Sequence, residues 1–273
     1  MPEPGCAGAD SDQRSRAGAR VSNPAATRRR VALVTGAARR IGAAVVRALH
    51  GRGLDVVVHY RNARDEAQAL ARALDLERPG TVTTFGCDLL DPGAPARLVS
   101  HATTRFGALD VLVNNASSFY PTPMDTATEA EFDDLIGTNL KAPFFASQVA
   151  APFLAARRGS IVNLADIHGR NPVAGYPAYC SAKAGLIMLT RALALELAPQ
   201  VRVNAVAPGI ALWPEGNGNT EARRRAEQLV PLRRTGSAEE VADAVTWLAL
   251  DASYTTGEVM AIDGGRGIAT VGP

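Results

Sequence analysis

Two residues four positions apart, Tyr179 and Lys183, form the pair best suited to proton chemistry in this chain. Both fall near the start of an expected helix, so this spacing places them on one helix face. A lysine ammonium next to a phenol stabilises the phenolate and lowers the tyrosine pKa, which makes the tyrosine a usable proton donor and acceptor. A surface lysine beside an aromatic residue is the alternative, but the chain has only one other lysine, Lys141.

A carboxylate precedes this tyrosine by thirteen residues: Asp166, in the run Leu-Ala-Asp-Ile-His that follows an expected strand. Ligands of a parallel sheet bind beyond the carboxyl ends of its strands, so Asp166 is a candidate for proton transfer. It could instead cap the turn after the strand. His168, two residues further on, could line the same pocket or be an ordinary loop histidine.

The elements that must position these groups are short β-branched runs alternating with longer helical patterns. Strands are expected at residues 31–35, 55–59, 81–85, 109–113, 159–164, 201–206 and 259–262. Helices are expected at about 41–49, 63–76, 94–106, 129–150, 176–197 and 239–250. This alternation predicts right-handed crossovers and a parallel sheet covered on both faces. We therefore predict a single α/β domain, a doubly wound Rossmann-type fold with a seven-stranded parallel sheet.

That domain is expected to span residues 30–273, after a disordered tail at residues 1–29 that lacks apolar periodicity. The tail has no apolar segment typical of a secretory signal, and its acidic residues argue against a transit peptide. Its arginine triplet leaves nucleic-acid contact as an unsupported alternative.

Composition excludes several classes of protein. With 47% hydrophobic and 21% charged residues the chain is typical of a folded globular protein, and it has no apolar run approaching the roughly 18 residues of a membrane-spanning helix. A net charge of +2 gives no electrostatic reason to expect nucleic-acid binding. The three cysteines, Cys6, Cys87 and Cys180, form no Cys-x-x-Cys pair, which argues against disulfides or a metal site and for a cytoplasmic protein.

The turn after the first strand is typical of a dinucleotide site. Gly36 would allow the tight turn, and Gly42 would let the following helix pack close to the sheet. The N-terminus of that helix offers free N–H groups to a pyrophosphate. A glycine-containing turn is weak evidence alone, since many helices begin this way.

The end of the second strand indicates which cofactor this site would bind. It ends in His-Tyr-Arg-Asn, residues 59–62, where an NAD site would carry an acid for the ribose 2′-hydroxyl. A basic, polar end suits a 2′-phosphate, so we expect NADPH, held by Arg39 and residues 59–62. The alternative is that these are solvated loop residues.

Polar residues also end the next two strands. Asp88 could accept a hydrogen bond from an adenine amine, and Asn115 lies in an Asn-Asn-Ala turn whose amides we expect to face the crevice. Either residue could instead cap a following helix.

Thr-Gly…Gly at 35–42, Asn-Asn-Ala at 114–116, Asn139, Tyr-x-x-x-Lys at 179–183 and Pro-Gly at 208–209 together resemble the short-chain dehydrogenase/reductase family over residues 30–268. The resemblance implies that Tyr179 is the acid, that Lys183 also holds the nicotinamide ribose, and that Asn139 completes a proton relay. The expected cofactor site comprises Gly36, Arg39, Arg40, Ile41, Gly42, His59, Tyr60, Arg61, Asn62, Asp88, Leu89, Asn115, Ala116, Lys183, Pro208 and Gly209.

Departures from the family pattern narrow the resemblance. Most members carry a serine where Asp166 stands and a glycine where Arg40 stands. These differences, with Asn-Ala-Ser-x-Phe-Tyr-Pro at 115–121, resemble the pteridine reductases and the similar bacterial dihydromonapterin and dihydrofolate reductases. That resemblance implies that Phe119 stacks on a pterin ring, that Arg40 and Ser117 contact its edge, and that Asp166 and Tyr179 supply protons.

Residues 210–214, followed by a Gly- and Asn-rich stretch, predict a substrate lid with Leu212 and Trp213 as further substrate contacts, although an ordinary surface loop is the alternative.

The leading hypothesis from the sequence is an NADPH-dependent pterin reductase. A short-chain carbonyl reductase of 3-oxoacyl type and a non-catalytic NADP-binding protein remain as alternatives, and the choice among biopterin, monapterin and folate substrates stays open. By analogy with the family we also expect a homotetramer, joined through the helices at 129–150 and 176–197.

Overall fold

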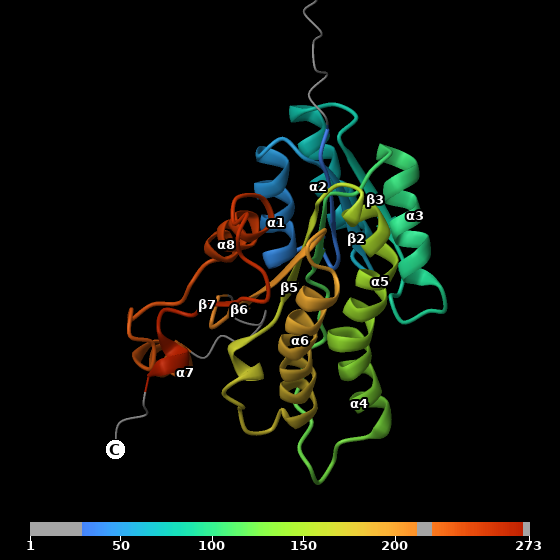
Figure 1. The fold of residues 1–273 in the computed structure, drawn as a ribbon. Coiled ribbons are helices and arrows are strands. Elements are labelled where there is room, and N and C mark those ends of the chain that lie inside the picture. Colours follow the sequence, from blue (N-terminus) through green and yellow to red (C-terminus); the bar gives the residue numbers. More distant parts are fainter. Residues whose placement is uncertain (1–28, 212–219, 270–273) are drawn as a thin grey trace, which may run out of the picture.

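The computed structural model describes residues 29–211 and 220–269, and its centre is one sheet of seven parallel strands (Figure 1). The strands lie in the order β3-β2-β1-β4-β5-β6-β7. Their bounds are β1 (Val31–Val34), β2 (Asp55–Tyr60), β3 (Val82–Gly86), β4 (Val111–Asn114), β5 (Ser160–Leu164), β6 (Arg202–Pro208) and β7 (Val259–Ile262). The expected single doubly wound α/β domain is therefore confirmed.

Helices cover both faces of the sheet (Figure 1). One face packs against α1 (Arg40–Gly51), α2 (Arg64–Glu77) and α8 (Ala238–Leu250), and the other against α3 (Ala94–Phe106), α5 (Ala142–Ala155) and α6 (Pro177–Glu196). The sequence of β1 is apolar throughout because both faces of this strand are buried. Ala32 and Val34 join the core on the first side, Val31 and Leu33 join the core on the other, and all four are fully buried.

The helix expected at 129–150 is in fact three consecutive elements. α4 (Glu129–Ile136) begins with a capping box between Thr128 and Glu131, a π-helical turn follows at Gly137–Lys141, and α5 continues the helix. π-helical turns are frequent at functional sites because they shift side chains relative to a regular helix. A further helix, α7 (Thr220–Gln228), precedes α8.

The strand order indicates where the ligand-binding crevice of this fold lies. The chain leaves β1 toward β2 on one side and returns to β4 on the other, and ligands bind beyond the carboxyl ends of strands at such a switch point. Leu212, Trp213 and residues 1–28 of the expected tail lie outside the described residues. Among the described helices, none has the length and apolar character needed to cross a membrane.

Candidate active site

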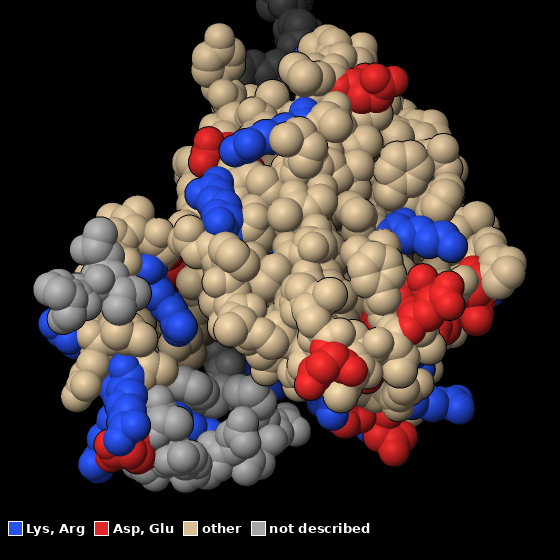
Figure 2. Space-filling view, turned by 90° about the horizontal axis from the view of Figure 1, so that it is seen from below, with Lys and Arg blue, Asp and Glu red and all other residues tan. Residues whose placement is uncertain are grey.

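A cavity of about 760 Å³ runs along the carboxyl ends of the strands. Seen from that side of the molecule, basic and acidic side chains are interspersed on a largely uncharged surface (Figure 2). Every residue expected to bind the cofactor borders the cavity, as do Ser117, Phe119, Asp166 and Tyr179. Residues that we did not anticipate also border it, namely Ala38, Ala63, Ser118, Thr138, Leu164 and Ala165.

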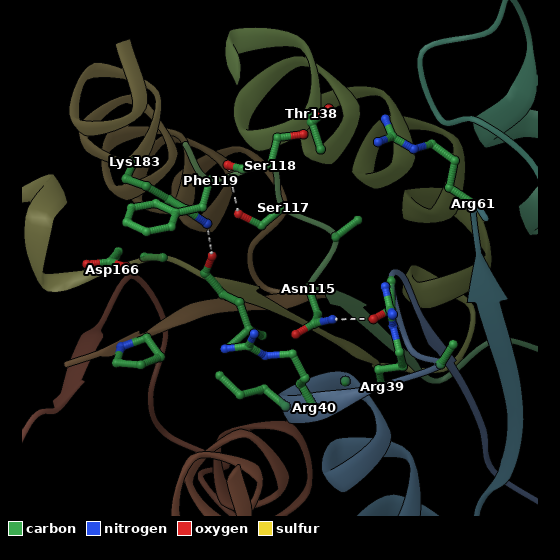
Figure 3. A pocket seen from close by; sticks show the side chains of 18 of the residues that line it. Arg39, Arg40, Arg61, Asn115, Ser117, Ser118, Phe119, Thr138, Asp166 and Lys183 are labelled. Carbon is green, nitrogen blue, oxygen red and sulfur yellow. Dashed lines mark hydrogen bonds between the residues drawn. The ribbon is translucent and has the colours of Figure 1, made fainter. Parts of the chain in front are cut away.

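Figure 3 shows two groups of side chains along this cavity. Phe119, Asp166 and Lys183 lie at one end, and Arg39 and Arg61 lie at the other. In this view Arg40 lies between the two groups. The cavity thus joins an aromatic and acidic end to a basic end, and the sequence assigned these to substrate and to cofactor respectively.

Tyr179 and Asp166 are directly hydrogen-bonded. The Tyr179 hydroxyl donates to Asp166 Oδ2 over 2.7 Å, while Asp166 Oδ1 accepts from the His168 backbone N–H over 2.8 Å. One oxygen of Asp166 therefore caps the short 3₁₀ turn Ile167–Gly169, as the alternative from the sequence proposed, and the other contacts the tyrosine. Its part in proton transfer stays a prediction. The cap holds the carboxylate in place beside the hydroxyl.

The pKa of Tyr179 shifts in the direction opposite to our expectation. Burial raises it well above the ordinary value, and the Asp166 carboxylate raises it further. Lys183 does not offset this, because its Nζ lies 5.7 Å from the centre of the tyrosine ring and donates to the Leu164 carbonyl over 2.8 Å. Tyr179 in this state is a protonated donor rather than a stabilised phenolate.

Lys183 is fully enclosed, with 3% of its surface exposed. Burial lowers its pKa to about 8, and the Asp166 carboxylate only partly opposes that shift. The ammonium group therefore loses its proton at a pH closer to neutrality than an ordinary lysine does. Its hydrogen bond to Leu164 anchors the start of α6 to the end of β5.

Asn139 is the one expected catalytic residue that does not border the cavity within the described chain. It lies in the π-helical turn and is fully buried. Its Oδ1 accepts from the Ser117 hydroxyl over 2.6 Å, and its Nδ2 donates to the backbone carbonyls of Ser118 and Leu135, each over 2.9 Å. Asn139 therefore fixes the loop after β4, and its place in a proton relay stays a prediction.

An aromatic face borders the acidic end. Phe119 is 49% exposed, and its ring stacks on Tyr176 with centroids 4.8 Å apart and planes 8° apart. It also meets Tyr179 edge to face at 4.7 Å. Tyr176 thus supports one face of Phe119 and leaves the opposite face for a ligand. The sequence reasoning missed Tyr176, although an aromatic residue directly before the helix-starting Pro177 could have indicated it.

The glycine turn has the features of an anion site. Gly36 has φ +60°, and a Cβ on Gly42 would lie 2.4 Å from the Gly36 carbonyl oxygen, so both positions require glycine. α1 begins without a side-chain cap and without an acid in its first turn, which leaves its N-terminus electropositive. Arg40 has φ +53°, a left-handed conformation that glycine adopts freely and an arginine rarely adopts.

Asn115 stabilises the same turn. Its Nδ2 donates to the carbonyls of Thr35 and Gly36, each over 2.9 Å, and Thr35 Oγ1 accepts from its backbone N–H. Figure 3 marks a hydrogen bond from the Asn115 amide with a dashed line. We expected this amide to face the crevice. The structure instead shows that it binds main chain of the glycine turn while bordering the cavity.

His59 requires a correction. It is 2% exposed, and its Nδ1 accepts from the Gly36 N–H over 3.1 Å while its Nε2 lies 3.1 Å from the Cys87 carbonyl. Burial lowers its pKa to about 4, so the ring is neutral at physiological pH. Both nitrogens are occupied by main chain, and His59 supports the glycine turn rather than offering charge to a phosphate.

The basic residues at this end have weak, solvent-exposed partners. Arg39 lies 3.7 Å from Glu66, and Arg61 lies 3.7 Å from both Asp88 and Asp134. Such exposed pairs contribute little and leave the guanidinium groups able to bind an anionic ligand. Asp88 also accepts from the Leu90 N–H through Oδ1, so it stabilises the turn after β3, and it is not the cap of the following helix, whose N-cap is Gly93.

These residues fit a nicotinamide dinucleotide. The uncapped helix N-terminus would hold its pyrophosphate. Arg61 directly follows β2, where an NAD site would carry an acid, and Arg39 lies in the glycine turn before α1. The roles of Ile41, Tyr60, Asn62, Leu89 and Ala116, and of Pro208 and Gly209, stay predictions, although all border the cavity.

Comparison with known proteins agrees with this site. The family model for enoyl-(acyl carrier protein) reductase matches residues 36–266. Pteridine reductase 1 of Leishmania tarentolae is 38% identical over 86% of this chain and 95% of its own length. The 3beta-hydroxysteroid dehydrogenase 1 of Eggerthella lenta is 36% identical over 85% and 92%, and a 3-oxoacyl-[acyl-carrier-protein] reductase of Staphylococcus aureus is 35% identical over 86% and 96%. The chain therefore belongs to the short-chain dehydrogenase/reductase family, whose members are oxidoreductases that bind NAD(P)H.

Proposed function

We propose that this protein reduces dihydropterins to tetrahydropterins with NADPH. The observation that carries the proposal is the 2.7 Å hydrogen bond from Tyr179 to Asp166 beside the exposed face of Phe119. Most of the family carries a serine at the position of Asp166. A flat heteroaromatic ring matches an aromatic face, and its ring nitrogen needs a proton when hydride reaches the adjacent carbon.

Bound NADPH would supply the hydride, and the chain would supply position and protons. Phe119, supported by Tyr176, would hold the pterin ring flat against one wall of the cavity. Tyr179 stays protonated because its pKa is raised, so it can give its proton to the ring nitrogen. Asp166 is less buried than Tyr179 and would return a proton to the tyrosine from solvent.

The preference for NADPH rests on the basic end of the cavity. Arg39 and Arg61 both border it, and the end of β2 carries no acid to bind a ribose 2′-hydroxyl. Guanidinium groups form charge-assisted hydrogen bonds with phosphate oxygens. His59 takes no part in this preference.

A carbonyl reductase is the main alternative, since relatives named for 3-oxoacyl and hydroxysteroid substrates are about as similar as the pteridine reductase. In that case Asp166 would be only a turn cap. A non-catalytic NADP-binding protein is disfavoured, because such a protein has no use for the buried tyrosine–carboxylate pair.

One assay separates these functions: NADPH oxidation with 7,8-dihydrobiopterin, 7,8-dihydrofolate and an acetoacetyl ester, each compared for the wild type, Asp166→Ser and Asp243→Ser. Asp243 is an exposed residue of α8 and serves as the matched control. We expect pterin reduction in the wild type and in Asp243→Ser, and loss of most of it in Asp166→Ser with NADPH affinity intact. Turnover of the ester alone, or near-normal pterin turnover in Asp166→Ser, would contradict the proposal.

We also propose that the protein is a homotetramer that uses the outer faces of α4, α5 and α6. Four phenylalanines on α4 and α5 are 40–49% exposed, namely Phe132, Phe144, Phe145 and Phe153. Exposed aromatic side chains grouped on neighbouring elements are typical of protein interfaces. Light scattering coupled to gel filtration would give the mass, and a monomer at micromolar concentration would contradict this expectation.

A further inference from the structure

His168 borders the cavity next to Asp166, and the proton chemistry proposed above leaves it without a role. It lies in the 3₁₀ turn Ile167–Gly169 and is half-buried. Its backbone N–H donates to the same carboxylate that accepts from Tyr179. His168 is thus a lining residue with a polar side chain, two residues after the carboxylate that contacts Tyr179.

The turn that carries His168 is held rigidly. Gly169 packs so closely on α6 that a Cβ would lie 2.8 Å from the Lys183 carbonyl carbon. Beyond it, the Arg170 guanidinium donates to the Val259 carbonyl over 2.9 Å, and the Asn171 amide donates to the Gly267 carbonyl over 2.8 Å. A polar group on such a rigid support is preorganised for binding, because little freedom is lost when a ligand arrives.

One ring nitrogen is already engaged. Nδ1 of His168 lies 3.0 Å from the Asn171 carbonyl oxygen, which can only accept a hydrogen bond, so Nδ1 carries a proton. In the neutral ring Nε2 is then the acceptor. Within the described part of the chain, no hydrogen bond reaches Nε2. The side chain therefore has one nitrogen left for a ligand.

We infer that His168 is a specificity-determining residue that selects dihydropterins with a hydroxyalkyl side chain, through a hydrogen bond between Nε2 and a side-chain hydroxyl. In the proposed binding mode the ring stacks on Phe119 with its nitrogen at Tyr179, and His168 lines the same cavity, so a substituent of the ring would lie within reach of this turn. A hydroxyl group both donates and accepts, so it satisfies Nε2 whether the imidazole is neutral or protonated. An alkyl substituent without a hydroxyl satisfies neither form. This inference rests on the proposed pterin reductase function.

The test compares two substrates that differ in these hydroxyls, 7,8-dihydromonapterin and 6-methyl-7,8-dihydropterin, with NADPH in excess. The wild type should favour the hydroxylated substrate roughly tenfold in kcat/KM, mostly through KM, as expected for one hydrogen bond. His168→Leu should bring the two substrates to similar values by raising KM for the hydroxylated one. His168→Gln, which keeps an acceptor and a donor, should recover part of the preference.

His101→Leu is the matched control. His101 lies on α3, where its Nε2 is 3.1 Å from Thr83 Oγ1, and it is not among the described residues that border the cavity. Its substitution should leave the substrate ratio unchanged. Wild-type protein that reduces both pterins equally, or a parallel fall for both in His168→Leu, would overturn this inference alone. Absence of any pterin reduction would overturn the proposed function and this inference with it.

Discussion

The buried ammonium of Lys183 makes a sharp prediction about stability and pH. Its pKa is about 8 in the folded protein against 10.5 for an ordinary lysine. Between these values the unfolded chain binds a proton that the folded protein has released, so the free energy of unfolding rises with pH. One pKa unit corresponds to about 1.4 kcal/mol, which gives a rise of about 2–3 kcal/mol between pH 8 and 10.

Tyr179 sets the upper limit of the pH range in which stability rises. Its pKa is raised well above 10 in the folded protein, so above pH 10 the unfolded chain loses a proton that the folded one keeps. Stability then falls with pH, and the two effects oppose each other. Measurements between pH 8 and 10 stay below this effect. Burial also raises the pKa of the Cys87 thiol, which lowers stability with pH in the same range, and the difference between wild type and Lys183→Met removes that shared contribution.

The assay is urea-induced unfolding of the cofactor-free protein, followed by tryptophan fluorescence at one protein concentration and at pH 7, 8, 9 and 10. Lys183→Met should lack the rise between pH 8 and 10, because the titrating group is gone. Lys141→Met is the control, since Lys141 is the only other lysine and is exposed on the π-helical turn. Its unfolding free energy should rise as in the wild type. We compare slopes because Lys183→Met also removes the donor to the Leu164 carbonyl, which shifts stability at every pH. A rise in Lys183→Met parallel to that of the wild type would refute the argument.

Four further predictions concern residues that line the cavity. NADPH should bind at least tenfold more tightly than NADH, and Arg39→Ala should reduce this difference by weakening the binding of NADPH alone. Calorimetric titration measures both dissociation constants. Equal affinities of the wild type for the two cofactors would contradict a 2′-phosphate site at the basic end of the cavity. Tyr179→Phe removes only the hydroxyl, so pterin turnover should fall roughly 10²–10⁴-fold while NADPH binding survives, and Phe119→Ala should chiefly raise the pterin KM. Loss of binding and turnover together in Tyr179→Phe would mean a structural tyrosine. His59 has a pKa of about 4 when folded against 6.5 when unfolded, so about 3 kcal/mol of unfolding free energy should be lost as pH falls from 6.5 to 4. In His59→Gln the free energy of unfolding, measured by urea denaturation, should fall less steeply between pH 6.5 and 4 than in the wild type. An equal fall in both proteins would count against a buried, neutral His59 ring.

The sequence by itself determined the architecture and many of the residues that border the cavity. β1 must be apolar on both faces in a covered parallel sheet, and that requirement is visible in four consecutive residues. The spacing of Tyr179 and Lys183 and the position of Asp166 at a strand end are likewise local features. Short-range sterics and hydrophobic periodicity determine such features, so the sequence alone reveals them.

Only the tertiary structure decided what environment those residues have. β2 pairs in parallel with β1 and β3, and His59 thereby reaches the glycine turn and the Cys87 carbonyl, which removes it from phosphate binding. The pKa of Tyr179 rises because segments far apart in sequence enclose it and place Asp166 against its hydroxyl. Asn139, in the π-helical turn, makes hydrogen bonds with Ser117 and Ser118 in the loop after β4 and does not border the cavity. Burial and hydrogen-bond partners depend on which distant segments pack together, and desolvation then decides the charge of each group.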